Sequence, residues 1–546
     1  MDRITLDVIG AGLLAVAEEM GEALIKSSYS TNIKERQDCS TALFNVQGEV
    51  IAQAEHIPMH LGSLIMIIHE ILRRYPLDAL RDGDAFVGND PYTGGSTHLP
   101  DITVASPVFA DGALIGFVAN IAHHADGSGR ETRSIWDEGL RIPPIRIVEG
   151  GRLREDVMEL ILLNFHLPRE RRGDFRAQFA ANRLGAARLQ ELARRYGRQT
   201  CAAAMDELLA YGERKIRAAI RSIPDGVYPF EDWMDDDGVG GPPVALRVRV
   251  TVAGDRIALD FAGTGPQVPG DINVVYLALV ATVYYVLKAV LDPDIPANGG
   301  FYRAIDVSAP EGSLVNAQPP APVAWRTQTC QRIADLVLGA LAPALPERVI
   351  AATNGANCAW VFSGTAPATK QYYVYLETIG GGSGARAAKD GLDGVQVHVT
   401  NTSNLPVECL EMEYPLFVEE YALVADSGGA GRFRGGLGIR RTVRVLGHEA
   451  TFLGTLERQR VAPFGLQGGG EGGRGALILN ADAPDQRDLG SKIAGLRLKP
   501  GDRVTIVTPG AGGYGVPAER DATLRARDAR DGKVSAIRPS APPASG

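Results

Sequence analysis

One apolar stretch restricts the fold of this chain more than any other part of the sequence. Two runs rich in β-branched residues, Ile102–Phe109 and Ala113–Ala122, flank the pair Asp111-Gly112, which is favoured in two-residue turns of β-hairpins. If the turn lies there, residues whose numbers sum to about 223 face each other across antiparallel strands. The sequence therefore predicts a hairpin whose open end brings His123 beside Pro100-Asp101.

The open end of this hairpin carries side chains that suit a metal ion. His98 lies three residues before Asp101, so two imidazoles and a carboxylate converge there with His123. This ligand set suits Zn²⁺, Mn²⁺ or Fe²⁺ and leaves coordination positions for water or substrate. A lone histidine is more often a structural residue, and that alternative predicts no bound metal.

The length of 546 residues exceeds what one hydrophobic core usually organises, so several lobes are expected. Apolar residues at three- and four-residue spacing predict an amphipathic helix over Ile4–Ser27, and strand-like alternation begins after Pro224-Asp225-Gly226. The sequence predicts a multi-lobed α+β fold, mixed helical and β-rich, with the metal site in the N-terminal domain. We expect an N-terminal α+β domain with a helical segment at 1–223, a middle α/β lobe at 224–380, a glycine-rich β lobe at 381–525, and a disordered tail at 526–546.

Composition excludes two classes of partner. A net charge of -9 with 22% charged residues provides no basic field for nucleic acid or for an anionic membrane. The run Val274–Leu291 is interrupted only by Lys288, but acidic residues flank it, so a buried core helix is expected and not a membrane span. The five cysteines are odd in number and form no CxxC pair, which favours reduced thiols. Since no secretory signal is recognisable, we expect a cytoplasmic protein.

Two further polar segments are candidates for lining the site. TNIKERQDCS (Thr31–Ser40) leads directly into a strand-like run, although a solvated loop is the alternative for it. EHIPMHLGS (Glu55–Ser63) carries His56 and His60, and Pro58 places this pair in a loop before a helix. We interpret the two histidines as site-lining residues and not as primary ligands.

The chain also carries six longer motifs in a specific order: NIKERQDCSTALFN, HIPMHLGS, GNDPYTGGSTHLPDITVASPVF, ANIAHHADGSG, VTNTSNLPVECLEMEYP and PGDRVTIVTPGAGGYGVP. Together they resemble the B subunit of the hydantoinase/oxoprolinase family, from about residue 4 to about residue 525. The resemblance implies a partner, the hydantoinase A-type subunit, which is an actin-like ATP-binding protein that phosphorylates the carbonyl oxygen of the substrate. The B subunit would then hydrolyse or carboxylate the activated intermediate at a metal.

Carried over to this sequence, the resemblance implies His98, Asp101 and His123 as metal ligands, with Asp38 of ERQDCS as a fourth. The identity of the metal stays open among Zn²⁺, Mn²⁺ and Fe²⁺. The chain contains no GxxxxGK[ST] phosphate loop, which agrees with ATP being bound by the partner in a hetero-oligomer.

Two branches of that family are alternatives for the reaction. One opens a cyclic amide such as a hydantoin, oxoproline or lactam by hydrolysis, and the other carboxylates acetone or acetophenone. Because the carboxylase subunits look considerably longer than 546 residues, we expect hydrolysis of the phosphorylated amide by a water that the metal activates. Glu35, His60 and His124 are the candidates for proton transfer. A non-catalytic scaffold subunit that only docks an enzyme partner is the remaining alternative.

Overall fold

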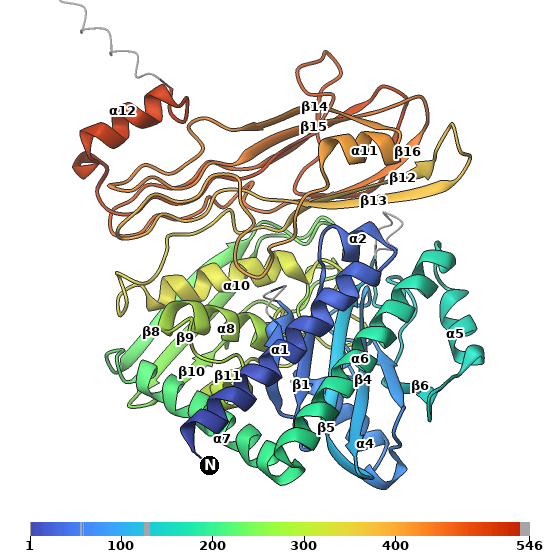
Figure 1. Cartoon of the computed structure of the whole chain (residues 1–546). Coiled ribbons are helices and arrows are strands. Elements are labelled where there is room, and N and C mark those ends of the chain that lie inside the picture. The colour runs from blue at the N-terminus through green and yellow to red at the C-terminus, as the bar shows by residue number, and fades with distance from the viewer. Residues whose placement is uncertain (1, 55–56, 58, 125–131, 536–546) are drawn as a thin grey trace, which may run out of the picture.

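The computed structural model describes residues 2–54, 57, 59–124 and 132–535. Figure 1 shows two lobes, a lower one built from helices and two sheets and an upper one built mainly from strands. The multi-lobed α+β class predicted from the sequence is confirmed.

The lower lobe is organised around a seven-stranded antiparallel sheet that contains the predicted hairpin. The hairpin strands β4 and β5 lie inside the sheet, so each is hydrogen-bonded on both edges. In spatial order the strands are β2 (Val50–Ala54), β1 (Cys39–Phe44), β5 (Ala113–His123), β4 (Asp101–Ala110), β3 (Ala85–Gly88), β6 (Ile145–Glu149) and β7 (Arg152–Leu153).

A β-bulge changes the predicted register of the hairpin by one residue. Next to the turn, Phe109 pairs with Leu114, whose numbers sum to 223 as predicted. Beyond the bulge the numbers of paired residues sum to 224, and Asp101 pairs directly with His123. A bulge adds one unpaired residue to one strand, and the neighbouring Gly116 allows the close approach that accompanies it. A Cβ at Gly116 would lie 2.3 Å from a backbone oxygen of β1.

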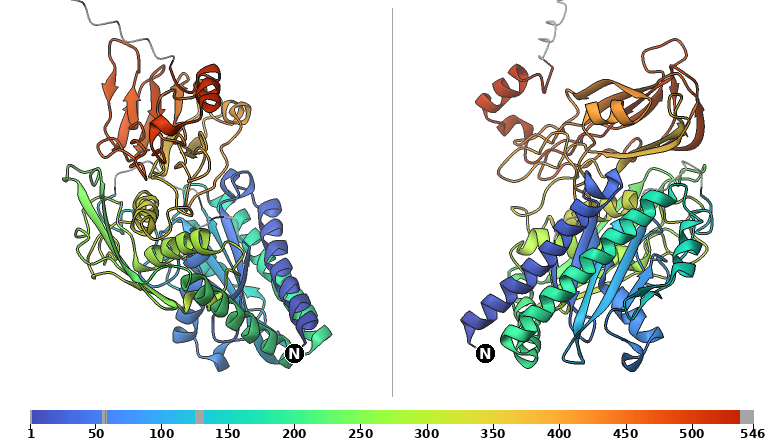
Figure 2. Two further views of the ribbon diagram at one scale, coloured as in Figure 1. Left: turned by 90° about the vertical axis from the view of Figure 1, so that its left-hand side faces the viewer. Right: turned by 45° about the vertical axis from the view of Figure 1, so that its right-hand side comes forward.

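Helices cover both faces of this sheet (Figure 2). One face carries α1 (Arg3–Ser27), α6 (Pro168–Tyr196) and α7 (Arg198–Ile220), and the other carries α4 (Ile65–Arg74). The short helix α3 (His60–Ser63) precedes α4 and packs against α8 (Tyr276–Leu291). The helix predicted over Ile4–Ser27 is confirmed, with Leu13 and Leu24 among its buried residues. The lobe also contains α2 (Thr31–Lys34), α5 (Glu155–Leu162) and the 3-10 turn η1 (Leu77–Ala79).

A second sheet and its helices complete the lower lobe. The strands β11 (Ile305–Ser308), β10 (Arg256–Asp260), β9 (Val244–Ala253) and β8 (Gly226–Met234) pack with α8 (Tyr276–Leu291), α9 (Gly299–Tyr302) and α10 (Arg326–Leu341). The run predicted at Val274–Leu291 contains the buried core helix α8, which begins two residues later, at Tyr276. No helix in the described part of the chain is both long and apolar enough to cross a membrane.

The upper lobe consists of two sheets that pack around Trp360, Phe362, Val443 and Ile506. One contains β13 (Tyr372–Ile379), β12 (Cys358–Thr365), β16 (Ala450–Thr455) and β19 (Lys492–Leu498). The other contains β14 (Leu416–Leu423), β15 (Ile439–Val445), β20 (Arg503–Val507), β17 (Ala476–Leu479) and β18 (Arg487–Asp488). The lobe also carries α11 (Val407–Glu413), the 3-10 turn η2 (Pro517–Glu519) and α12 (Ala522–Arg530).

The segment predicted to be disordered from residue 526 begins instead with the end of α12. Asp521 caps this helix by accepting hydrogen bonds from the backbone N–H groups of its first turn. Arg520 forms ion pairs with Asp528 of the helix and with Asp390. Asp390 lies 130 residues from Arg520 in sequence, and Asp528 lies within the charged run of the helix itself. The charge pattern of the segment therefore did not reveal these ion pairs. Residues 536–546 lie outside the described residues.

Buried ion pairs join the two lobes. Arg458, which follows β16, donates hydrogen bonds to Asp232 of β8 and to Asp335 of α10. Arg332 of α10 pairs with Glu457 of the upper lobe at 3.0 Å. All five side chains are buried, and removing one member of such a network leaves an uncompensated buried charge. The network therefore fixes the position of the upper lobe on α10.

Candidate metal centre

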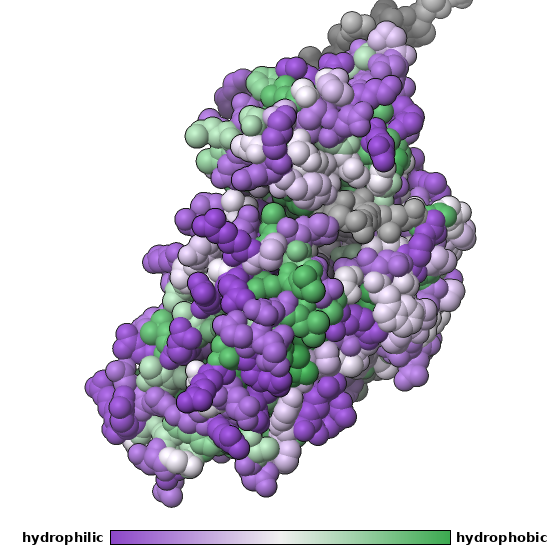
Figure 3. Space-filling model, turned by 90° about the vertical axis from the view of Figure 1, so that its right-hand side faces the viewer, coloured by the Kyte–Doolittle hydropathy of each residue, from purple (hydrophilic) through white to green (hydrophobic). Residues whose placement is uncertain are grey.

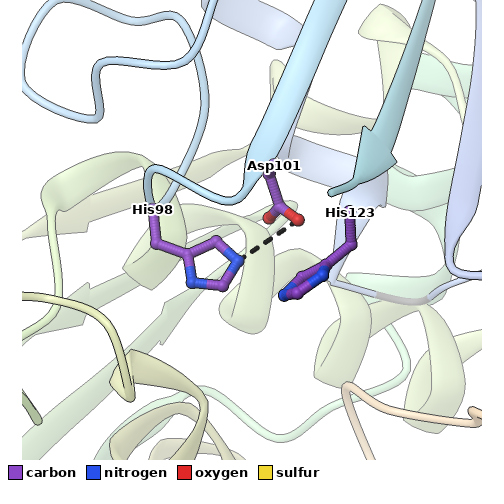
Figure 4. A group of neighbouring side chains, drawn as sticks. All are labelled: His98, Asp101 and His123. Carbon is purple, nitrogen blue, oxygen red and sulfur yellow. Dashed lines mark ion pairs between the residues drawn. The ribbon is translucent and has the colours of Figure 1, made fainter. Parts of the chain in front are cut away.

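Three side chains from the open end of the hairpin converge on one point (Figure 4). His98 lies in the loop before β4, Asp101 is the first residue of β4, and His123 is the last residue of β5. One ligand atom from each lies within 4.8 Å of the others, and the two imidazole centroids are 5.1 Å apart. The structure thus brings together the three residues that the hairpin places at its open end.

The hydrogen bonds of His98 leave a lone pair directed at the carboxylate of Asp101. Nδ1 of His98 lies 3.1 Å from the carbonyl oxygen of Ala324, so it carries the proton and donates it there. Burial and the charge of Arg326 lower the pKa of His98, which keeps the ring neutral near pH 7. Its buried Nε2 receives no hydrogen bond from any described residue and lies 3.2 Å from Oδ1 of Asp101. Two acceptors at this distance repel each other unless a cation lies between them, so the pair fits a divalent metal.

His123 is held by Asn32 from α2. Nδ2 of Asn32 lies 3.1 Å from Nδ1 of His123 and donates to the carbonyl oxygen of the same residue at 2.8 Å. Burial lowers the pKa of His123 to about 4, so this ring is also neutral near pH 7. A neutral, oriented imidazole is the form that binds metals.

Arg326 balances the negative charge of the centre. Its Nη2 donates to Oδ2 of Asp101 and its Nε to Oγ1 of Thr97, both at 2.7 Å. Burial alone would raise the pKa of Asp101, but the charge of His98 when its ring is protonated and the charge of Arg326 keep this pKa well below its usual value. Because His98 is neutral near pH 7, Arg326 is the cation that acts on Asp101 there. Asp101 is therefore ionised, and its Oδ1 is free of Arg326.

His60 lies beside the centre as a buried base. Nδ1 of His60 is 3.0 Å from Oγ of Ser40, whose own proton goes to the carbonyl oxygen of Cys39. Nδ1 therefore donates, and Nε2 keeps its lone pair, 3.9 Å from Oδ2 of Asp101. Burial lowers the pKa of His60, so the ring is neutral and able to accept a proton near pH 7.

Asp38 lies at the border of the group. Its carbonyl oxygen accepts a hydrogen bond from the backbone N–H of His123 at 3.0 Å, and its side chain lines the same cavity. The cluster of atoms within 4.8 Å of one another in the described residues does not include Asp38. The structure therefore places Asp38 near the centre but outside its tightest group.

The centre opens into a cavity of about 330 Å³ between the lobes. A volume near 300 Å³ is at the small end for ligand sites, so a small molecule is the expected occupant. Arg36 crosses the junction and donates to the carbonyl oxygen of Leu376 at 2.8 Å. The lower lobe lines the cavity with Arg36, Asp38, Met59, His60, Glu138, Asp271, Trp325 and Arg326, and the upper lobe with Asn357, Val361, Leu376, Thr378 and Leu453.

Two residues expected to transfer protons do not line this cavity. Glu35 is exposed at the C-terminal end of α2. His124 is buried on the other side of the strand end, with Nε2 3.0 Å from Oε1 of Gln178 and its ring 4.9 Å from that of Phe175. His56 lies outside the described residues.

Two cavity residues, Arg326 and Glu138, could not be found from the sequence. Arg326 contacts Asp101 across 225 positions of sequence, and no local pattern predicts such a contact. Glu138 follows Asp137 in a loop, where a solvated position is the usual expectation for a carboxylate.

Comparisons with known proteins agree with one another. The family model described as hydantoinase B/oxoprolinase matches residues 2–517. The B subunit of a putative D-/L-hydantoinase from Pseudomonas sp. (strain NS671) is 34% identical, over 98% of this chain and 93% of the relative. The crystal structure of ATP-dependent caprolactamase from Pseudomonas jessenii superposes with a TM-score of 0.91 at 33% identity, covering 98% of this chain and 95% of that chain. A nucleotide-free acetone carboxylase structure has a TM-score of 0.89 at 18% identity, covering 98% and 78%, which shows a shared fold.

Proposed function

Because the chain belongs to the hydantoinase B/oxoprolinase family, we propose that it is the B-type subunit of an ATP-dependent enzyme that opens a cyclic amide by hydrolysis. One observation carries the proposal. The unprotonated Nε2 of His98 and Oδ1 of Asp101 face each other at 3.2 Å on the wall of a small cavity, an arrangement that a cation would stabilise.

In this proposal His98, Asp101 and His123 hold one divalent metal, with Asp38 as a fourth ligand. Two imidazoles and carboxylates suit Zn²⁺, Mn²⁺ and Fe²⁺ alike. When bound, the metal would supply a Lewis acid at the cavity wall.

The side chains of this subunit would bind and deprotonate the reactants. His60 is placed to accept the proton of the attacking water at Nε2, while its Nδ1 stays bound to Ser40. The substrate would arrive with its carbonyl oxygen phosphorylated, and two buried guanidinium groups in the cavity wall suit that charge. Nη1 of Arg326 and Nε of Arg36 are buried without a hydrogen-bond partner among the described residues, and guanidinium groups bind phosphoryl oxygens well.

We assign ATP to a hydantoinase A-type partner in a hetero-oligomer, because this chain has no Walker-type phosphate loop. Exposed apolar surface supports a subunit contact. Figure 3 shows a hydrophobic patch on the otherwise mostly hydrophilic lower lobe. Leu160 of α5 and Leu163, which follows this helix, are 61% and 84% exposed. The five cysteines are free, which supports a reducing compartment such as the cytoplasm.

The test is an isotope experiment on the complex with an A-type partner and ATP in H₂¹⁸O. The proposal expects ¹⁸O in the carboxylate of a ring-opened product from a panel of hydantoins, oxoproline and lactams. The isolated chain should turn over none of them. Labelled bicarbonate entering a ketone, with no ring opening of any cyclic amide, would favour the carboxylase alternative. Absence of both reactions and of bound metal would favour the scaffold alternative.

A further inference from the structure

Glu138 is a buried carboxyl group that the proposed roles leave unused. Its Oε1 accepts hydrogen bonds from the backbone N–H groups of Val323 and Ala324, the latter at 2.8 Å. Its Oε2 is buried and has no hydrogen-bond partner in the part of the chain that the structure describes, although Glu138 lines the cavity. A buried carboxylate oxygen without a donor is costly, so this oxygen either carries a proton or is satisfied by a ligand.

Backbone contacts fix Glu138 relative to the candidate metal centre. The N–H group of Ala324 donates to Glu138, and the carbonyl oxygen of Ala324 accepts the proton of His98. The loop that carries Glu138 is held to the same segment, since Ile135 is fully buried and its N–H donates to Pro320 at 2.9 Å. Glu138 and His98 are thus attached to one residue and open into one cavity.

The surroundings of Glu138 favour its protonated form. Burial, followed by the nearby charge of Asp271, raises the pKa of Glu138 to about 8, although the two backbone donors oppose this shift. The charge of Asp271 is itself held in place by Thr132, which donates to its Oδ2 at 2.9 Å. Near pH 7 most of the Glu138 population therefore carries a proton. With Oε1 occupied by two donors, that proton is at Oε2, on a residue that lines the cavity.

We propose that Glu138 is a general acid that protonates the ring nitrogen of the substrate as the amide bond breaks. The inference rests on the proposed function. After water has added to the phosphorylated carbon and lost one proton to His60, the carbon carries a hydroxyl group, the phosphoryl oxygen and the ring nitrogen. The C–N bond then breaks and its electron pair goes to nitrogen, which takes the proton from Oε2 of Glu138. The hydroxyl group becomes C=O and releases its proton to water, which also reprotonates Glu138, and His60 returns its proton to water. The ring-opened product is then an acyl phosphate, and attack of a second water on phosphorus breaks its P–O bond to give the carboxylate and inorganic phosphate.

The test compares wild type, Glu138→Gln and Glu311→Gln in the complex with the A-type partner. Glutamine keeps a carbonyl oxygen for the N–H groups of Val323 and Ala324 but cannot donate an acidic proton. Glu311 is exposed in a loop away from the cavity and controls for the loss of one carboxylate. General acids contribute roughly 10²- to 10⁴-fold, so kcat for a lactam should fall by about that factor in Glu138→Gln and stay unchanged in Glu311→Gln.

Two readouts separate an acid from a structural residue. The wild-type kcat should decline above about pH 8, and this limb should disappear in Glu138→Gln. The loss should also be smaller for a hydantoin, whose departing nitrogen is less basic than that of a lactam. An unchanged alkaline limb together with equal losses for both substrates would overturn the proposal, as would near-wild-type activity.

A third readout does not depend on turnover. Infrared difference spectra of the isolated chain should contain a protonated-carboxyl band that titrates near pH 8 and is missing from Glu138→Gln. Absence of this band would overturn the inference even if the complex opens lactams. If the band is present but the wild-type complex opens no cyclic amide, the proposed function is wrong, and so is the role of Glu138 in protonating the ring nitrogen. The protonation of Glu138 itself is then still supported.

Discussion

Replacing Asp101 by Asn in the metal-free protein should destabilise the lower lobe, because it leaves Arg326 buried without a counter-charge. The two side chains are in contact at 2.7 Å and are 1% and 3% exposed. Breaking such a pair costs about 3–5 kcal/mol. The new amide can donate to Nε2 of His98, which offsets about 1 kcal/mol, so the expected net loss is about 2–4 kcal/mol.

This loss converts into a measurable shift of the melting temperature. The lower lobe has roughly 350 residues, and an unfolding entropy of about 2.1 cal/mol/K per residue gives about 0.7 kcal/mol/K. Calorimetry on chelator-treated protein should therefore show the melting temperature of Asp101→Asn lowered by about 3–6 °C. Adding Arg326→Met should recover part of this loss, because the unpaired charge is then absent.

The matched control is Asp306→Asn, which breaks an ion pair with Arg256. That pair has a similar distance, 2.9 Å, but its side chains are 53% and 61% exposed. Breaking it should therefore lower the free energy of unfolding by less than about 1 kcal/mol. If Asp101→Asn melts within about 1 °C of wild type, or if the losses in Asp101→Asn and Arg326→Met simply add in the double variant, the argument from the buried pair is wrong.

Metal content and the pH dependence of stability test the site in two other ways. Plasma emission spectroscopy should find about one divalent metal per chain in wild type and little in His123→Ala. The control His69→Ala, which changes an exposed histidine on α4, should keep the wild-type metal content. Equal metal content in all three proteins would contradict a metal at His123. Since the pKa of Glu138 is raised from 4.5 to about 8 in the folded protein, its stabilising contribution is fully present below about pH 4.5 and is lost as the pH rises to about 8, at up to about 1.4 kcal/mol per pH unit. Thermal melts across this range should therefore fall less steeply in Glu138→Gln, and equal slopes in the two proteins would place the raised pKa elsewhere.

The hairpin could be predicted because its information is local. A two-residue turn and two apolar runs determine which residues face each other, and this was enough to bring His123 beside Asp101. The bulge next to Gly116 shifted the register by one, since it depends on the backbone of β1, which approaches from about 70 residues away.

The proton-transfer candidates show the limit of local patterns. His123 and His124 are adjacent in sequence, but successive residues of an extended strand point to opposite faces. Only His123 can face the centre, and His124 turns towards Gln178. Arg326 and Glu138 reach the cavity through contacts between distant segments, which no periodicity encodes.

The short segment Val323–Arg326, at which α10 begins, organises the site more than any single side chain does. Within it, backbone N–H groups fix Oε1 of Glu138, the carbonyl oxygen of Ala324 sets the proton of His98, and the guanidinium of Arg326 balances Asp101. The acid, one imidazole and the carboxylate are therefore positioned by neighbouring residues of one chain segment. Because α10 is also joined to the upper lobe by the buried pair of Arg332 and Glu457, the contact that fixes the upper lobe on α10 and the contacts that position these three groups belong to one continuous stretch of chain.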